Sequence, residues 1–316
     1  MKRPVLLAAG AALLATLAGA LWWRMGSAPP VPVLPGLDDA TMATLYATPL
    51  PAADQPLSVF HIGHSLVNRD MPAMLAQLAG DGHRYESQLG WGAQLQSHWG
   101  DSPVNGFEAE NAHPRYRDAR EAVSSGDYDA IVLTEMVEIR DALRYFDSAR
   151  YLAQFADTAL AARPDVRIYL YETWHPLNDP EGWLERIDAD LARYWEAGIL
   201  RPALLQLPEG SRIYLIPAGQ ALAALVRTIE AQGGVGNVKD RRDLFSDDIH
   251  LNDLGNYFIA LVHYAVLYGS SPEGLPHELM RADGTAADAP APETARLMQQ
   301  IAWQVARSTP LTGLAP

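Results

Sequence analysis

Cysteine is absent from the 316-residue sequence. Its absence excludes disulfide bonds, thiolate nucleophiles, Cys-ligated metals and lipid anchors attached to cysteine. It also removes the residue that would otherwise indicate the redox compartment of the protein. The chemistry and the localisation of the protein therefore have to be inferred from the other residue types.

Basic side chains are scarce as well. Lys and Arg number 24 against 38 Asp and Glu, which gives a formal net charge of -14 and a pI near 5.0. An acidic surface disfavours the phosphate backbone of nucleic acids, so we expect no nucleic-acid partner. Hydrophobic residues make up 48% of the chain, which is enough to bury a large core.

The amino-terminal segment "MKRPVLLAAGAALLATLAGALWW" sets Lys2 and Arg3 before an apolar run that ends at Arg24. The run is close to the ~20 residues that span a bilayer, and its Ala-Gly-Ala at 18–20 resembles a signal-peptide cleavage site. Residues 1–28 are therefore predicted to be either a signal peptide or a membrane anchor through residues 4–23. Both interpretations predict that the remainder is periplasmic or extracellular, and only the second gives it a membrane contact.

Three further regions follow this leader. Residues 29–54 are Pro-rich and are predicted to be a linker. Residues 55–270 are predicted to form one domain, and residues 271–316 a C-terminal extension. The extension contains a stretch predicted to be flexible, "ADGTAADAPAPE", and one amphipathic helix, "TARLMQQIAWQVARS". The sequence contains no internal repeat, and it does not predict an oligomeric state.

Apolar β-rich runs alternate with helix-patterned segments in the predicted domain. Such continuous runs are typical of parallel strands buried on both faces. The predicted strands are 57–63, 83–90, 128–136, 167–174 and 212–219, of which the polar 83–90 suits a sheet edge. The predicted helices are 70–80, 114–125, 146–162, 181–198, 219–232 and 252–269. This alternation predicts an α/β fold of three layers, doubly wound around a sheet of mainly five parallel strands.

Two stretches contain the residue types of a serine nucleophile and its base, "VFHIGHSLVNRDMP" at 59–72 and "LFSDDIHLNDLGNYF" at 244–258. A serine becomes nucleophilic when a histidine, oriented by a carboxylate, accepts its proton. Ser65 follows the first predicted strand, and Asp247 lies three residues before His250, so one turn can bring them together. Asp248 lies on another side of that turn. Taken alone, each stretch has an ordinary alternative, because His250 could cap the next helix and Ser65 could cap a turn.

Two other kinds of site fit less well. Ser65 lacks the second glycine of the Gly-x-Ser-x-Gly nucleophile elbow, so the α/β-hydrolase fold is a poorer match. A metallohydrolase could use the Asp and His residues of the two stretches, namely His61, His64, Asp247, Asp248 and His250. Their spacing is not that of a known metal site, so we expect no metal and no other cofactor.

Taken together, "IGHS", "GWGAQLQSHW" and "DDIHLNDLGNY" resemble the SGNH (GDSL-like) hydrolase family over about residues 57–268. The resemblance implies a flavodoxin-like SGNH hydrolase fold with Ser65, Asp247 and His250 as the catalytic residues. It also implies an oxyanion hole made by the N–H groups of Ser65 and Gly92, with Gly90 as the alternative. "GAQLQSHW" and "HLNDLGNY" look like the members of the family that act on acylated carbohydrates.

The third family block departs from this pattern. An Asn side chain usually donates to the oxyanion there, whereas this chain has "VLTEM". Thr134 could donate through its hydroxyl, and Glu135 could donate only when protonated. Glu135 could equally be a structural carboxylate paired with an Arg. Loss of one oxyanion donor can cost about 10²–10³ in rate, so a slow or inactive protein remains an alternative.

Aromatic and His side chains near the strand ends suggest how a substrate is held. Trp91, Trp174 and His175 are predicted to contact it, although each could instead be a core or loop residue. The sequence as a whole predicts an exported serine esterase that removes O-acetyl, or another small acyl group, from a polysaccharide. The alternative is a non-catalytic polysaccharide-binding or assembly protein of the envelope with the same fold.

Overall fold

The computed structural model describes residues 28–315, so the predicted leader lies outside the described residues except for its last position. The chain from Pro32 onward forms one compact unit. None of the helices in the described range is long and apolar enough to cross a bilayer.

Five parallel strands form the centre of this unit. They lie in the order β2-β1-β3-β4-β5, which is the flavodoxin-like arrangement. Their bounds are β1 (Ser58–His64), β2 (Arg84–Gly90), β3 (Ala130–Leu133), β4 (Arg167–Glu172) and β5 (Ile213–Pro217). The predicted fold class is therefore confirmed, and the polar strand β2 lies at an edge as expected. The side chains of β1, β3 and β5 are buried throughout, because helices cover both faces of the sheet.

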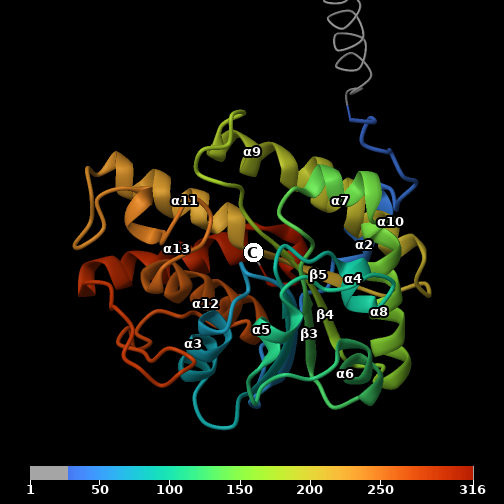
Figure 1. The fold of residues 1–316 in the computed structure, drawn as a ribbon, viewed down its shortest axis with the longest axis horizontal. Coiled ribbons are helices and arrows are strands. Elements are labelled where there is room, and N and C mark those ends of the chain that lie inside the picture. The colour runs from blue at the N-terminus through green and yellow to red at the C-terminus, as the bar shows by residue number, and fades with distance from the viewer. Residues whose placement is uncertain (1–27, 316) are drawn as a thin grey trace, which may run out of the picture. The chain divides into compact units, whose positions relative to one another are not determined.

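Helices cover the two faces in separate groups (Figure 1). One face carries α3 (Asp70–Ala79), α11 (Ala218–Ala231), α12 (Asp253–Tyr268) and α13 (Pro292–Ser308). The other carries α4 (Leu95–Trp99), α6 (Ala119–Ser125), α8 (Ser148–Ala162), the π-helical η1 (Leu191–Leu200) and α10 (Arg201–Leu205). Three shorter segments near the carboxyl ends of the strands are α5 (Phe107–Asn111), α7 (Ile139–Tyr145) and α9 (Trp183–Asp190). Three layers result, as the alternation of strands and helices predicts.

The segments outside the predicted domain also carry structure. The amphipathic helix expected in the extension is α13, which packs on α11 and α12 through its apolar face. The predicted linker contains α2 (Asp39–Leu45), whose first turn is capped by the side chain of Asp38. Tyr46, which follows α2, packs edge-on against Tyr214 of β5 at 5.9 Å. Composition alone missed α2, because its seven residues lie within a Pro-rich stretch.

Candidate active site

The turn after β1 presents Ser65 at the carboxyl edge of the sheet. Gly63 allows the chain to pass close to the end of β3, since a Cβ there would lie 2.5 Å from Cγ2 of Thr134. Asn68 adopts a positive φ of 46°. Its side-chain Oδ1 accepts hydrogen bonds from the N–H groups of Asp70 and Met71 and so caps α3. Glycine and asparagine thus fix the turn that carries the serine.

The same turn is tied to the loop that carries the histidine. Asn68 Nδ2 donates to Oδ1 of Asn256 on α12 at 2.8 Å. Asn252 begins α12 by accepting the N–H groups of Leu254 and Gly255. Gly255 lets the helix approach the preceding loop, because a Cβ there would lie 2.5 Å from the carbonyl oxygen of Leu244. The "HLNDLGN" stretch therefore encodes a helix start docked against the turn of "GHSLVN".

Ser65, His250 and Asp247 lie within hydrogen-bond distance in series. His250 Nε2 is 2.9 Å from Oγ of Ser65, and His250 Nδ1 is 2.7 Å from Oδ2 of Asp247. A carboxylate beside Nδ1 keeps the proton on that nitrogen, so Nε2 presents its lone pair to the hydroxyl. The arrangement allows the serine proton to pass to the imidazole.

Asp247 is ionised in this arrangement. Partial burial would raise the pKa of its carboxyl, but the N–H groups of His250 and Ile249 and the ring of His250 hold that pKa at about 2. Asp248 turns away from His250: its carboxylate accepts from Asn178 Nδ2 at 2.8 Å and pairs with Arg242 at 3.4 Å. The two neighbouring carboxylates therefore have different partners.

Two backbone N–H groups near Ser65 lack an acceptor. Within residues 28–315, no group accepts a hydrogen bond from the N–H of Ser65 or from that of Gly92. Gly92 is exposed and has a φ of 54°, a conformation that favours glycine. Gly90 instead ends β2 against Val104, whose Cγ1 would lie 2.3 Å from a Cβ at this position. Of the two glycines, Gly92 is the one whose N–H has no acceptor among residues 28–315, and Gly90 is a packing residue.

The hydroxyl of Thr134 does not face the serine. It donates to the carbonyl oxygen of Tyr171 at 2.7 Å, and the residue is fully buried. Its proton is therefore engaged between β3 and β4. This geometry conflicts with the expectation that the Thr134 hydroxyl replaces the missing Asn donor. The sequence placed Thr134 at the end of its strand but could not give the direction of its side chain.

Glu135 is a buried carboxyl without an Arg partner among the described residues, so the structural ion pair considered above is absent there. Its Oε1 accepts the N–H groups of Met136 at 2.8 Å and Leu95 at 3.4 Å. Burial raises its pKa to about 7 despite these bonds and the nearby hydroxyl of Ser148. Neither Oε2 nor the Ser148 hydroxyl has a hydrogen-bond partner in the described range. Through Oε1, Glu135 holds the loop between Gly92 and α4.

His64, the residue before Ser65, links two loops. Its Nε2 donates to the carbonyl oxygen of Glu135 at 2.8 Å, and its Nδ1 accepts the N–H of Leu66 at 3.3 Å. Burial lowers the pKa of its ring to about 4, so the ring is neutral. Both nitrogens are occupied, which does not fit a metal ligand. The described residues include no group of three or more His, Cys, Asp or Glu side chains arranged to hold a metal ion.

His98 is a site residue that the sequence reasoning missed. Its Nε2 donates to the carbonyl oxygen of Gly63 at 2.8 Å, and its Nδ1 accepts from Gln88 Nε2 at 2.9 Å. The ring thereby fixes α4 against the ends of β1 and β2. The motif "GAQLQSHW" contains this histidine, but spacing alone gives no sign that it points inward.

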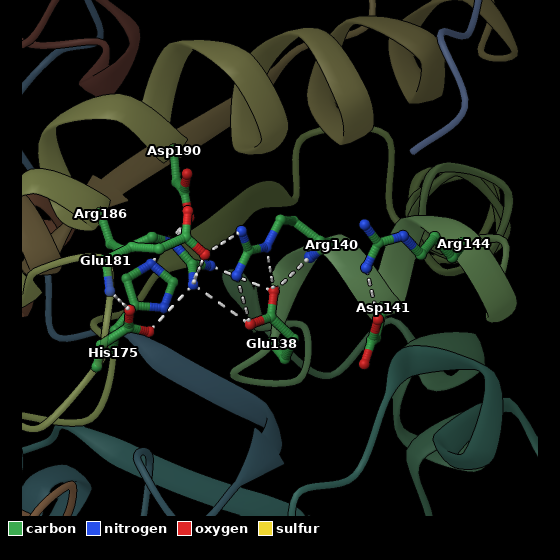
Figure 2. Close-up of polar contacts among 9 residues, drawn as sticks. Glu138, Arg140, Asp141, Arg144, His175, Glu181, Arg186 and Asp190 are labelled. Atoms are coloured by element: carbon green, nitrogen blue, oxygen red, sulfur yellow. Dashed lines mark hydrogen bonds and ion pairs between the residues drawn. The ribbon is translucent and has the colours of Figure 1, made fainter. Parts of the chain in front are cut away.

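Trp174 and His175 do not line the site, contrary to the sequence-based prediction. Trp174 is 0% exposed, and its ring N–H donates to the carbonyl oxygen of Ile249 at 2.8 Å. His175 is 3% exposed, and its Nε2 lies 3.0 Å from Oδ2 of Asp190 (Figure 2). Both residues follow β4 as expected, but their side chains turn into the protein and cannot stack on a sugar.

A buried polar cluster surrounds His175 and is centred on Arg186 (Figure 2). Arg186 donates to Asp190 at 2.8 Å, to Asp179 at 3.1 Å and to Glu138 at 3.2 Å. Burial would raise the pKa of Glu138, but Arg140 and Arg186 hold it at about 2. The cluster joins α7, α9 and the loop after β4.

That loop in turn supports the segment that carries Asp247 and His250. The backbone N–H of Leu177 donates to the carbonyl oxygen of Asp248 at 2.7 Å, and Trp174 binds the next carbonyl along the chain. Two consecutive peptide carbonyls are thus held from the β4 side. The cluster around Arg186 therefore does not hydrogen-bond to Ser65 or His250, but it holds the loop that supports the segment of Asp247 and His250.

Comparisons with known proteins give a limited result. No protein-family profile matches the chain, and no curated protein matches it. Among solved structures, a candidate platelet activating factor from Streptococcus pneumonia is 15% identical with a TM-score of 0.40, covering 81% of this chain and 99% of its own. A carbohydrate acetylesterase from Sinorhizobium meliloti is 13% identical with a TM-score of 0.32, covering 79% of this chain and 99% of its own. This chain is similar to both at low identity, and neither likeness assigns it a function.

Proposed function

We propose that this protein is an exported serine esterase that removes O-acetyl, or another small acyl group, from a polysaccharide. The observation that carries the proposal is the series Asp247, His250 and Ser65, joined at 2.7 and 2.9 Å. The free N–H groups of Ser65 and Gly92 lie on the turns after neighbouring strands and supply the complementary donors.

In the first half of the reaction, Oγ of Ser65 attacks the ester carbonyl carbon while its proton moves to Nε2 of His250. Asp247 holds the imidazole in the correct tautomer and stabilises the imidazolium that forms. The N–H groups of Ser65 and Gly92 bind the oxyanion of the tetrahedral intermediate. Collapse of this intermediate breaks the bond to the sugar oxygen, which leaves as a hydroxyl with the proton from His250.

In the second half, water attacks the acyl-serine ester, and His250 accepts one proton from that water. The new intermediate collapses to release the carboxylic acid, and the proton on His250 returns to Oγ of Ser65. The cycle uses only protein side chains and water. With two backbone donors and no third side chain in the oxyanion hole, we expect a slower enzyme than one with all three.

A fluorophosphonate probe tests the proposal without knowledge of the natural substrate. An activated serine forms a stable phosphonyl ester with such a probe, so the purified protein should be labelled at Ser65 and should hydrolyse an aryl acetate. Labelling should be competed by the aryl acetate. Absence of both labelling and hydrolysis would contradict the esterase proposal.

The alternative is a non-catalytic polysaccharide-binding protein of the same fold. Its support is the third block, where the hydroxyl of Thr134 is engaged and Glu135 faces backbone N–H groups. In that case the protein would bind acetylated polysaccharide, and the probe would not label it. The labelling experiment therefore separates the two proposals.

The two adjacent carboxylates give a matched pair of variants. Asp247→Ala should lower kcat for an aryl acetate by about 10²–10⁴, because the imidazole loses its orienting partner. Asp248→Ala removes a carboxylate bound to Asn178 and Arg242 and should lower kcat by less than about tenfold. Steady-state rates of the two purified variants decide the assignment. A greater loss for Asp248→Ala would reverse it.

Glu135→Gln is expected to change how stability and rate depend on pH. The folded pKa of about 7 lies above the usual carboxyl value, so the unfolded chain loses this proton first as pH rises. Stability is therefore lost between about pH 4.5 and 7, by up to about 3 kcal/mol. The amide cannot ionise, so the variant should be the more stable protein at pH 8 and should keep or gain activity there.

Glu172→Gln is the control for this prediction. Burial raises the pKa of Glu172 to about 8, and its carboxyl binds Gln220 rather than the loop of Gly92. This substitution should also improve stability at high pH but should leave the shape of the rate profile unchanged. Melting temperature and kcat against pH are the measurements. Identical rate profiles for the wild type and Glu135→Gln would mean that Glu135 has no influence on turnover.

We also propose that residues 29–316 lie outside the inner membrane, supported by Lys2 and Arg3 before the long apolar run. A reporter that is active only in the exported compartment, fused after Pro316, should be active. Activity of a reporter that works only in the cytoplasm would contradict this proposal.

A further inference from the structure

The indole of Trp91 is exposed next to the glycine that we propose for the oxyanion hole. Trp91 is 56% exposed, yet its ring N–H donates to Oε1 of Glu110 at 2.7 Å and its backbone N–H donates to Asn105 at 2.7 Å. The ring also covers Gly106, where a Cβ would lie 2.2 Å from it. A large aromatic ring held in one orientation offers a flat contact face at little entropic cost.

A groove of about 780 Å³ begins at the residue that holds this indole. Glu110 lines it, as do Asn68 and Arg69 from the turn that carries Ser65. Tyr85 on the edge strand β2 and residues 281–283 also line it. The groove therefore extends from the turn that carries Ser65 to the edge strand β2, where residues 115–117 hydrogen-bond to Ser87.

Hydrogen-bond donors and acceptors both line the groove. Arg69 and Arg115 have no carboxylate within ion-pair distance among residues 28–315, whereas Arg281 pairs with Asp253 at 2.5 Å. The other polar side chains of the lining are the hydroxyls of Tyr85 and Ser87, the ring of His113 and the carboxylates of Asp70, Glu110 and Asp283, whereas the amide of Asn68 is engaged with Asn256. Such a mixture suits a ligand that presents many hydroxyl groups, since each hydroxyl donates one bond and accepts others.

Two other ligand classes fit the groove less well. A polyanion would meet three carboxylates against two unpaired guanidinium groups. A long acyl chain would need a continuous apolar wall, and the apolar members of the lining are only Pro72, Ala112, Pro114 and Ala282. An uncharged, polyhydroxylated chain is the ligand that the lining matches.

We propose that Trp91 and this groove bind the sugar units that flank the acylated unit of an uncharged glycan. One unit stacks on the indole, and its neighbours form hydrogen bonds with Arg69 and Arg115 along β2. This proposal rests on the esterase function and names the class of its substrate. It also implies that the enzyme acts on units within a chain rather than on free monosaccharides.

The test compares acetylated oligosaccharides of one to four units, built from glucose, mannose, galactose, xylose or N-acetylglucosamine. For at least one series, kcat/KM should rise by about tenfold or more between the monosaccharide and the tetrasaccharide. Each variant is scored by this ratio, so a change in the chemical step cancels. Trp91→Ala and Arg115→Ala should each remove most of the gain, and Trp91→Phe should keep part of it. Arg296→Ala, which removes the same charge from the exposed side of α13, should leave the ratio unchanged.

The outcomes separate this proposal from the one on which it rests. No gain with chain length in any series, or a gain that survives both alanine variants, would overturn the groove proposal while aryl acetate hydrolysis persists. If the wild type did not hydrolyse aryl acetate, the esterase function would fail. In that case calorimetric titration of the same tetrasaccharides would still decide whether Trp91 and Arg115 bind a glycan.

Discussion

Ser65→Ala is expected to lower kcat/KM for an aryl acetate by about 10⁴–10⁶, because no other group can form the acyl intermediate. His250→Ala should lower it to a similar degree, since the two residues act as a unit and their effects do not add. The double variant should therefore be about as slow as either single variant. Rates measured for the three proteins under the same conditions give the comparison.

Ser246→Ala is the control for the loss of a serine hydroxyl, because Ser246 lies in the loop that carries Asp247 and His250. The hydroxyl of Ser246 donates to the carbonyl oxygen of His250 at 3.1 Å, but it does not contact the ring. This variant should keep its rate within about tenfold of the wild type. Wild-type activity in Ser65→Ala would show that another nucleophile is at work.

Acidification from pH 6.5 to pH 4 is expected to lower the free energy of unfolding steeply. Burial lowers the folded-state pKa of His64, His83, His98 and His263 to about 4, and it lowers that of His61 well below its usual value. The unfolded chain takes up protons on these rings below about pH 6.5, whereas the folded chain does not. Stability is therefore intact above pH 6.5 and is lost as pH falls toward the folded pKa.

Two buried carboxyls act in the opposite direction over the same range. Glu135 and Glu172 keep their protons when folded and lose them when unfolded above about pH 4.5. Near pH 5.5 the five histidines add about five protons to the unfolded chain and the two carboxyls remove about two, so the unfolded chain binds about three more protons than the folded chain. The free energy of unfolding therefore changes by about 4 kcal/mol per pH unit. Urea denaturation at half-unit steps of pH measures this slope.

A single substitution tests the origin of this slope. His263→Leu should reduce it by about one proton, or about 1.4 kcal/mol per pH unit, because one buried imidazole is removed. Tyr264→Phe, at the next position of α12, changes no group that titrates in this range and should leave the slope unchanged. Equal denaturation midpoints at pH 5 and pH 7 in the wild type would contradict the prediction.

The sequence predicted the sheet and the proximity of Ser65, His250 and Asp247 more fully than the positions of the other candidate side chains. The strands are continuous apolar runs, and the turns that place Ser65 and His250 depend on local chemistry, such as the cap formed by Asn252. The positions of Trp174, His175 and Thr134 after their strands were also predicted. Their side-chain directions were not, because these depend on partners that are distant in sequence: Ile249, Asp190 and Tyr171.

Tertiary contacts also explain the residues that the sequence did not indicate. His98 binds the carbonyl of Gly63, 35 positions earlier, and Arg186 gathers carboxylates from α7, α9 and the loop after β4. Neither contact has a periodic or short-range signature. The exposed Trp91 was predicted to contact substrate, but the groove beside it required the fold to bring residues 281–283 near α5.

The hydrogen bond between the amides of Asn68 and Asn256 joins the turn that carries Ser65 to α12, the helix that follows His250. Neither amide carries a charge, so dissolved ions do not screen their contact as they would an ion pair, and neither gains or loses a proton between acid and neutral pH. The contact between the turn of Ser65 and α12 is thus independent of ionic strength and of the protonation of Asp247 and His250. In the proposed esterase, this contact would help to keep the serine and the histidine aligned while the charges around them change.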